Sequence, residues 1–279
     1  MVNGLMENGG YAMDLGKKRL FLLDLDGTVY LEETLLPGAA AFFRWAAESG
    51  AHVRYLTNNS SRGVEAGLEK MHRLGVPARR EEFLTAVEAA IYYLRTRRKA
   101  GEAYYVVGTE SFCSQLRQAG IDVRCTPDAD VAAVLVGFDT ELCYQKVEDA
   151  CRLLFRGADF LATNPDLACP TLYGFMPDCG AICRLIVSAV GREPVYIGKP
   201  DPTMIRLALE QTGCAAEEAL MVGDRLYTDI ACGRNAGVDT VLVLTGEATA
   251  ADAAASATPP TLICRDMAEL LARIQEAQS

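Results

Sequence analysis

The stretch that decides the fold is Leu20-Phe21-Leu22-Leu23-Asp24-Leu25-Asp26-Gly27-Thr28. Its first four residues form an unbroken apolar run, which is typical of a strand buried on both faces of a parallel sheet. Two carboxylates follow directly. Burying acidic groups is costly unless a cation or a hydrogen-bond donor compensates them. Because open α/β sheets bind ligands at the carboxyl ends of their strands, the pair predicts a metal-assisted site there.

Composition limits the class of protein. The 279 residues are enough for one large domain or two modest ones, and 50% hydrophobic with 23% charged residues is ordinary for a globular chain. The net charge of −10 argues against a nucleic-acid partner, which would need a basic surface for phosphate contacts. No window approaches the roughly 18 consecutive apolar residues of a membrane span, so we expect no membrane partner.

The cysteines and the N-terminal segment bear on the compartment. Residues 1–16 contain no basic segment followed by an apolar core, so the sequence shows no secretory signal. The ten cysteines are scattered and form no Cys-x-x-Cys pair, which favours buried free thiols over disulfides or zinc. Reduced thiols without an export signal predict a cytoplasmic protein.

Short apolar strands alternate with amphipathic helices, which predicts parallel sheets covered by helices on both faces. We expect strands at 19–24, 53–56, 104–108, 133–137, 160–163, 195–198, 219–223, 240–244 and 261–264. The three from 104 to 163 begin a new α/β unit, and the strand at 195–198 resumes the first one. We expect helices at about 37–49 and 63–74, and a surface loop or short helix at 248–260.

Several strands are followed at once by a polar or ionisable residue. These residues are Asp24 and Asp26, Thr57, Lys199, and Asp224 with Asp229. In a doubly wound sheet the carboxyl ends of adjacent strands meet at one crevice, so we expect these side chains to converge there. Carboxylates, a hydroxyl and an ammonium are the groups that phosphate chemistry on a hard cation requires.

The acids fit Mg²⁺, which prefers a few carboxylate oxygens together with waters and a substrate phosphate. Asp24 and Asp224 are the natural ligands, and Asp229 can bind the metal or its waters. An EF-hand is the rival interpretation of Asp-x-Asp-Gly. It fails because the glycine comes too early and the twelfth position counted from Asp24 is Leu35 instead of Glu.

The same residues supply a nucleophile and a proton carrier. A carboxylate can attack phosphorus and form an aspartyl-phosphate, which divides hydrolysis into two easier steps. The neighbouring Asp26 can then act as acid on the leaving oxygen and as base on water. Lys199 would pair with the phosphate and the nucleophile. Thr57 and the amides of the following turn would bind phosphate oxygens, with Asn58 and Asn59 either contacting the substrate or only forming the turn.

Four motifs occur in order along the chain. They are Asp24-Leu-Asp26-Gly-Thr28, Thr57-Asn58-Asn59, Gly198-Lys199-Pro200 and Gly223-Asp224-x₄-Asp229. With them the chain resembles the haloacid dehalogenase superfamily of phosphatases. Further stretches resemble its subfamily IIA branch of NagD-like, 4-nitrophenyl, phosphoglycolate and pyridoxal phosphatases, namely 56–60, 157–166, 221–225 and 240–246. The likeness covers nearly all of the chain after residue 18.

The resemblance assigns roles to the acids. It implies that Asp24 is the nucleophile and Asp26 the general acid/base. It also implies that the Mg²⁺ ligands are Asp24, Asp224 and the main-chain carbonyl of Asp26, with Asp229 supporting the metal. Lys199 is then the catalytic cation beside the nucleophile.

The resemblance also implies an architecture. A doubly wound, Rossmann-like catalytic core would comprise residues 1–82 and 193–279, and an inserted α/β cap of the C2 type would comprise 83–192. Such a cap closes over the core, excludes water and contributes to specificity. Because caps in this branch often mediate dimers, a homodimer through the cap is a further expectation.

Two cap positions leave alternatives open. Relatives carry Pro-Gly-x-Gly in the cap loop facing the site, whereas this chain reads Met176-Pro177-Asp178-Cys179-Gly180. Asp178 either is tolerated by the turn, or binds the substrate and favours an amine or hydroxyl distal to the phosphate. Asn164 and Asp166 either present groups to the ligand or form an Asx turn around Pro165.

The function predicted is a Mg²⁺-dependent phosphomonoester hydrolase of small phosphorylated metabolites. Nucleotides, sugar phosphates, glycerol phosphate, phosphoglycolate and pyridoxal phosphate all remain open as substrates. One alternative is a catalytically inactive phospho-ligand-binding or regulatory protein, against which the intact acids and Lys199 weigh. Another is a phosphotransferase such as a phosphomutase, which the large insertion after Thr57, in place of a helical cap soon after Asp26, disfavours.

Overall fold

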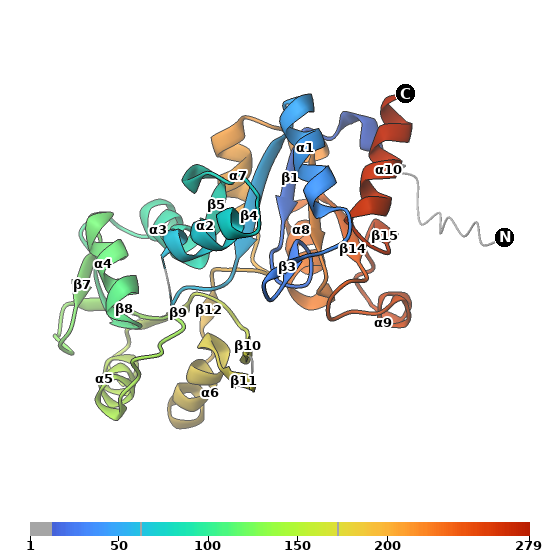
Figure 1. Cartoon of the computed structure of the whole chain (residues 1–279). Helices are drawn as coiled ribbons and strands as arrows, with labels where there is room; N and C mark the ends of the chain where they lie inside the picture. Colours follow the sequence, from blue (N-terminus) through green and yellow to red (C-terminus); the bar gives the residue numbers. More distant parts are fainter. Residues whose placement is uncertain (1–12, 62, 172) are drawn as a thin grey trace.

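The computed structural model describes residues 13–61, 63–171 and 173–279 of the chain. Two parallel sheets, each flanked by helices, make up most of the molecule (Figure 1). We call the larger one the core sheet and the other the cap sheet. None of the helices in the described ranges combines the length and the apolar character that crossing a membrane requires.

The core sheet has six strands in the order β15-β14-β13-β1-β4-β5, all paired in parallel. Its strands are β1 (Leu20–Leu23), β4 (His52–Thr57), β5 (Phe83–Thr85), β13 (Ala219–Gly223), β14 (Asp239–Val243) and β15 (Leu262–Cys264). The strand β1 lies between β13 and β4, with Leu23 beside Val222 and Tyr55. The segments that follow these three strands therefore leave the sheet side by side.

Both faces of the core sheet are buried, because successive side chains of β1 point to opposite faces. Phe21 and Leu23 pack in the cluster that contains side chains of α1 (Ala39–Ser49), α2 (Val64–Arg73) and α10 (Met267–Gln278). Leu20 and Leu22 pack in the cluster that contains side chains of α3 (Ala86–Arg97), α7 (Thr203–Thr212) and α8 (Ala231–Ala236). This explains why the run at 20–23 is apolar without alternation.

The cap sheet has five strands in the order β12-β9-β8-β6-β7, again all parallel. They are β6 (Ala103–Val107), β7 (Asp122–Arg124), β8 (Val131–Val136), β9 (Asp159–Ala162) and β12 (Val195–Tyr196). One face packs with α4 (Glu110–Gln118), and the other with α5 (Tyr144–Phe155) and α6 (Cys179–Val190). Two hairpins complete the fold, β2 (Tyr30–Leu31) with β3 (Thr34–Leu35) and β10 (Ala168–Thr171) with β11 (Gly174–Pro177).

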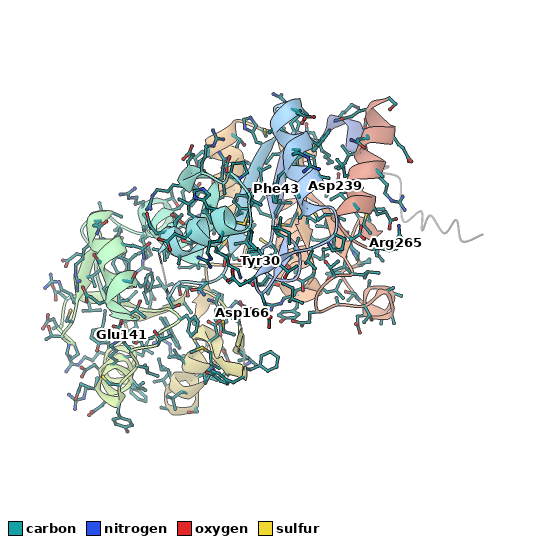
Figure 2. The ribbon with its side chains drawn as sticks, in the orientation of Figure 1. Tyr30, Phe43, Glu141, Asp166, Asp239 and Arg265 are labelled. Atoms are coloured by element: carbon teal, nitrogen blue, oxygen red, sulfur yellow. The ribbon has the colours of Figure 1, made fainter. Side chains whose placement is uncertain are left out.

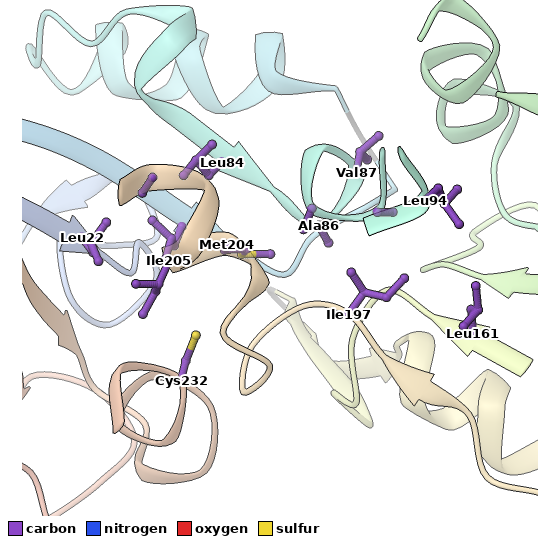
Figure 3. Packing of buried hydrophobic residues seen from close by; sticks show 14 of the residues in the cluster. Leu22, Leu84, Ala86, Val87, Leu94, Leu161, Ile197, Met204, Ile205 and Cys232 are labelled. Carbon is purple, nitrogen blue, oxygen red and sulfur yellow. The ribbon is translucent and has the colours of Figure 1, made fainter. Parts of the chain in front are cut away.

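One hydrophobic cluster joins the two sheets. It extends from Leu22 of the core sheet, past Ala86 and Leu94 of α3, to Leu161 of the cap sheet (Figure 3). The helix α3 also contacts both α7 and α4. The two sheets therefore share buried apolar surface, which stabilises their relative position.

The strand pairing corrects the predicted boundaries at two places. Residues 83–85, assigned to the cap, form β5 and pair with β4 of the core sheet. Residues 195–196, assigned to a core strand, form β12 and pair with β9 of the cap sheet. Both are edge strands, and the partner of a short edge strand depends on which sheet edge the chain reaches. The stretch 248–260 was expected to be a surface loop or a short helix, and it contains the short helix α9 (Ala250–Ala255).

Candidate active site

The end of β1 brings a carboxylate and an ammonium together. Asp24 follows β1 directly, and its main-chain amide donates to the carbonyl of Val222 at 2.9 Å. Lys199 follows β12, is only 2% exposed, and donates from Nζ to Asp24 Oδ1 at 2.5 Å. The same Nζ donates to Asp229 Oδ1 at 2.7 Å and to the carbonyl oxygen of Leu56 at 3.1 Å.

Charge pairing decides the protonation of Lys199. Burial disfavours its charged form, but the carboxylates of Asp229 and Asp24 outweigh burial and raise its pKa. The ammonium is therefore retained in the site. It is held between two acids far apart in the sequence, Asp24 directly after β1 and Asp229 in the helical turn after β13.

Three acids converge beside Lys199. One carboxylate oxygen each from Asp24, Asp224 and Asp229 lies within 4.8 Å of the others. Burial raises the pKa of Asp24 well above its usual range, and the charges of Asp229 and Asp224 add to the effect. Burial and the charge of Asp229 also raise the pKa of Asp224 to about 6. Three buried carboxylates this close together can all be ionised only if a cation compensates their charge.

The residues present fit a divalent metal ion. Asp224 Oδ2 accepts from the amide of Glu247 at 2.8 Å, whereas its buried Oδ1 has no hydrogen-bond partner in the described part of the chain. Oxygen-only donors of this kind suit Mg²⁺. The buried, unpartnered oxygen of Asp224 is therefore available to coordinate such an ion.

Glycines make room for the acids. A Cβ added to Gly246 or to Gly27 would collide with the carboxylate of Asp224, and one added to Gly223 would collide with Asp229. Gly27 also has a φ of +88°, which glycine adopts without the strain that a side chain brings. The glycines at these positions therefore allow the clustered acids Asp224 and Asp229 to approach the backbone closely.

Asp26 lies apart from this cluster. Its side chain is 56% exposed and lies 3.6 Å from Nζ of Lys70 on α2. Lys70 in turn lies over the ring of Tyr30, 3.7 Å from its centroid. The prediction of Asp26 as a metal residue concerned its main-chain carbonyl, and its exposed carboxylate is suited to a separate role in proton transfer.

Many polar groups of the loop after β4 form hydrogen bonds with one another or with neighbouring segments. Thr57 Oγ1 accepts from the amide of Asn59 at 3.2 Å, and Asn59 Oδ1 accepts from both the amide and the hydroxyl of Ser61 at 2.9 Å. The side chain of Asn58 bonds to the main chain of Lys199 and to Asp166. The three candidate side chains of this loop, Thr57, Asn58 and Asn59, thus all form hydrogen bonds within the protein itself.

Asp166 lies in the loop after β9 of the cap sheet and extends toward the core sheet. Figure 2 shows it between the parts of the molecule that contain the two sheets. Asn164 Nδ2 donates to the carbonyl of Asn58 at 2.8 Å, and Asn164 Oδ1 accepts from the amide of Asp166 at 3.0 Å. The second bond is the predicted Asx turn, and the first is a contact with the loop after β4.

Asp178 begins α6 as its N-cap. It is 6% exposed, and its Oδ1 accepts from the amide of Cys179 at 2.5 Å. Burial raises the pKa of Asp178 to about 7 despite that amide, and the charge of Asp166 contributes. Asp178 is therefore a helix-capping residue, and ionising it in this buried position lowers the stability of the folded protein.

Two residues that lie close to the acids, Lys70 and Gly246, were not predicted from the sequence. Lys70 could not be singled out, because one lysine on an amphipathic helix is ordinary. Gly246 was seen only as part of the stretch 240–246, and its closeness to Asp224 follows from the return of the chain after β14. Arg225, which follows Asp224 in the sequence, lies 3.0 Å from the carboxylate of Glu247.

Comparisons with known proteins agree with this geometry. A model of haloacid dehalogenase-like hydrolases matches residues 21–122, and a model of HAD-hydrolase-like proteins matches residues 196–270. An acid sugar phosphatase of Staphylococcus aureus is 34% identical over 258 residues, which are 92% of this chain and 98% of that protein.

Solved structures match over nearly the whole chain. A 4-nitrophenylphosphatase from Thermotoga maritima has a TM-score of 0.86 and 35% identity, covering 94% of this chain and 99% of the other. A glycerol phosphate phosphatase from Mycobacterium tuberculosis, solved with magnesium, has a TM-score of 0.85 and 28% identity over 93% and 78% of the two chains. With its acids, lysine and inserted sheet, the chain belongs to the haloacid dehalogenase superfamily of phosphatases, in the subfamily IIA branch of NagD-like and 4-nitrophenyl phosphatases.

Proposed function

We propose that the protein hydrolyses phosphomonoesters of small metabolites with Mg²⁺, through an aspartyl-phosphate on Asp24. The observation that carries this proposal is the arrangement of Asp24, in hydrogen-bond contact with Lys199 and within 4.8 Å of two further acids. A binding protein would need the cation and the phosphate-binding groups but not an acid held for attack.

Asp24 and Asp26 divide the reaction between them. An oxygen of Asp24 attacks phosphorus, the bond from phosphorus to the leaving oxygen breaks, and the Asp26 carboxyl gives that oxygen its proton. In the second step Asp26 takes a proton from water, whose oxygen attacks phosphorus and releases inorganic phosphate and Asp24. The exposure of Asp26 leaves it free to approach both the leaving group and water.

The remaining groups bind and orient. Asp24, Asp224, Asp229 and the carbonyl of Asp26 would hold Mg²⁺, which when bound offsets the charge of the acids and the phosphate. Lys199 holds Asp24 in place and balances charge on the phosphate. Thr57 and the main-chain amides of the loop after β4 would bind phosphate oxygens.

The substrate class rests on the cap. Relatives carry names that include sugar and glycerol phosphates, and the buried acid Asp178 stands at the start of α6, where relatives in this branch carry glycine. We propose that Asp178 favours leaving groups with a hydroxyl or amine distal to the phosphate. A segment comprising most of residues 83–192 would act as the cap.

Location and assembly follow as further proposals. The cysteines of the described ranges form no disulfide, which supports a reducing cytoplasm. Exposed Tyr144 and Phe155 on α5 support a homodimer through the cap, and sedimentation equilibrium would give twice the chain mass.

Asp24→Asn tests the function. We expect turnover of 4-nitrophenyl phosphate with Mg²⁺ to fall by at least about 10³-fold, because the amide cannot attack phosphorus. The circular dichroism spectrum should stay unchanged, because Asn keeps an oxygen that can accept from Lys199. Substantial residual activity in a pure sample would refute the assigned nucleophile. A wild-type protein that binds inorganic phosphate but hydrolyses no ester would favour the inactive binding protein instead.

A further inference from the structure

The side chain of Asn58, in the loop after β4 of the core sheet, is the centre of a hydrogen-bond network that includes the loop after β9 of the cap sheet. Its Oδ1 accepts from the amide of Lys199 at 3.0 Å, and its Nδ2 donates to the carbonyl of Lys199 at 3.1 Å. The other hydrogen of Nδ2 goes to Asp166 Oδ2 at 2.9 Å. Both hydrogens of the amide group are thereby used.

This network fixes the backbone of the residue that carries the catalytic ammonium. A single amide side chain holds both the N–H and the C=O of Lys199, while Nζ of Lys199 bonds to Asp24 and Asp229. The preceding residue, Gly198, is packed so closely that an added Cβ would collide with the carbonyl of Thr163 and with Asn58. A small rotation of Asn58 would therefore move the main chain of Lys199.

Asp166 is the cap group that restrains Asn58. It lies in the loop between β9 and β10, and Asn164 fixes this loop by bonding to both Asp166 and Asn58. Asp166 forms no hydrogen bond with Lys199 itself among the described residues; its hydrogen bond goes to Asn58, and beyond that it interacts with Lys199 through charge alone. Its second oxygen, Oδ1, is buried and has no hydrogen-bond partner in the described ranges.

We propose that Asp166 is a positioning residue: from the cap, and through Asn58, it sets the place of Lys199 against Asp24. This inference rests on the proposed function and adds a link between the cap and the catalytic charge. A buried donor that loses its partner is costly, so Asn58 reorients when Asp166 is truncated. The attack of Asp24 then takes place in a less favourable geometry, which lowers kcat more than it changes KM.

The experiment compares steady-state kinetics of Asp166→Ala and Asp166→Asn on two esters, 4-nitrophenyl phosphate and glycerol phosphate, with Mg²⁺. We expect Asp166→Ala to lower kcat about tenfold on both, which equals about 1.4 kcal/mol, with KM within about twofold. Asp166→Asn should stay within about threefold of the wild-type kcat. It keeps an oxygen for Asn58 and places its NH₂ where Oδ1 makes no hydrogen bond.

Asp149→Ala is the matched control. Asp149 is a buried acid of the cap helix α5, and its carboxylate bonds to Gln145 and Tyr105 instead of to the core. It should keep the wild-type kcat even if it lowers the melting temperature. If Asp166→Ala does not fold, Asp166→Glu replaces it, because an added methylene displaces the accepting oxygen while keeping the charge. The proposal then requires a lower kcat for Asp166→Glu on both esters.

The outcomes separate the proposals. A wild-type protein inactive on both esters overturns the proposed function. An active wild type with an unimpaired Asp166→Ala, or with Asp166→Asn as impaired as Asp166→Ala, overturns only the positioning role. A change confined to KM or to one ester would make Asp166 a group that contacts the leaving group, which also overturns it.

Discussion

Replacing Asp178 by Asn removes an ionisable group from a position where burial opposes ionisation. The carboxyl caps α6 through the amide of Cys179, and its pKa is raised from 3.8 to about 7. Asn can form the same cap, because its Oδ1 is also an acceptor. The substitution therefore tests the charge while leaving the helix start intact.

The sign follows from proton linkage. Between pH 3.8 and about 7 the folded protein binds a proton at Asp178 that the unfolded chain has released, so stability falls as the pH rises through this window. A shift of about three pKa units corresponds to about 4 kcal/mol, which we take as an upper bound. At pH 5 about 2 kcal/mol of this destabilisation is present, and at pH 8 all of it. The advantage of Asp178→Asn over the wild type should therefore grow by about 2 kcal/mol between pH 5 and pH 8.

Urea unfolding followed by circular dichroism at the two pH values measures this difference. Asp178→Ala is the control, since it shares the pH dependence but loses the cap, and it should be less stable than Asp178→Asn by about 1 kcal/mol at both pH values. The reasoning is refuted if the wild type and Asp178→Asn differ equally at pH 5 and pH 8, or if the wild type is the more stable at pH 8.

Two further predictions concern the metal and the substrate. Gly246→Ala should weaken the apparent affinity for Mg²⁺ in the phosphatase assay by at least about tenfold, because its Cβ would displace the carboxylate of Asp224. Gly63→Ala is the control, and equal Mg²⁺ affinities of the wild type and Gly246→Ala would contradict a metal-binding role of Asp224. Asp178→Gly should change the ratio of kcat/KM between glycerol phosphate and 4-nitrophenyl phosphate, and a profile like that of the parent would exclude a role of Asp178 in substrate choice.

The central strand and its acids could be predicted, because their signals are local. An apolar run ended by Asp24 already indicates a doubly buried strand with a polar carboxyl end, and the same pattern recurs at Gly223-Asp224. Parallel pairing then places both ends at one edge. Lys199 was predicted for the same site, although β12 before it belongs to the cap sheet.

The polar loops could not be predicted to the same depth. Asn58 was expected either to contact the substrate or only to form the turn, and its side chain bonds to Lys199 and Asp166. Two alternatives were left open for Asp178, tolerance by its turn and binding of the substrate. In the structure its carboxylate caps the helix α6. In each case the deciding partner is an atom whose position the local sequence does not specify.

The sequence by itself determined the class of fold and the acids that gather at the ends of β1 and β13, because the apolar residues that bury each strand are its own. Only the tertiary structure decided which donors and acceptors near these acids form hydrogen bonds within the protein. Hydrogen bonds require atoms within about 3 Å of each other. The bond between Asn58 and Asp166 joins residues 108 positions apart, and only folding brings them to that distance.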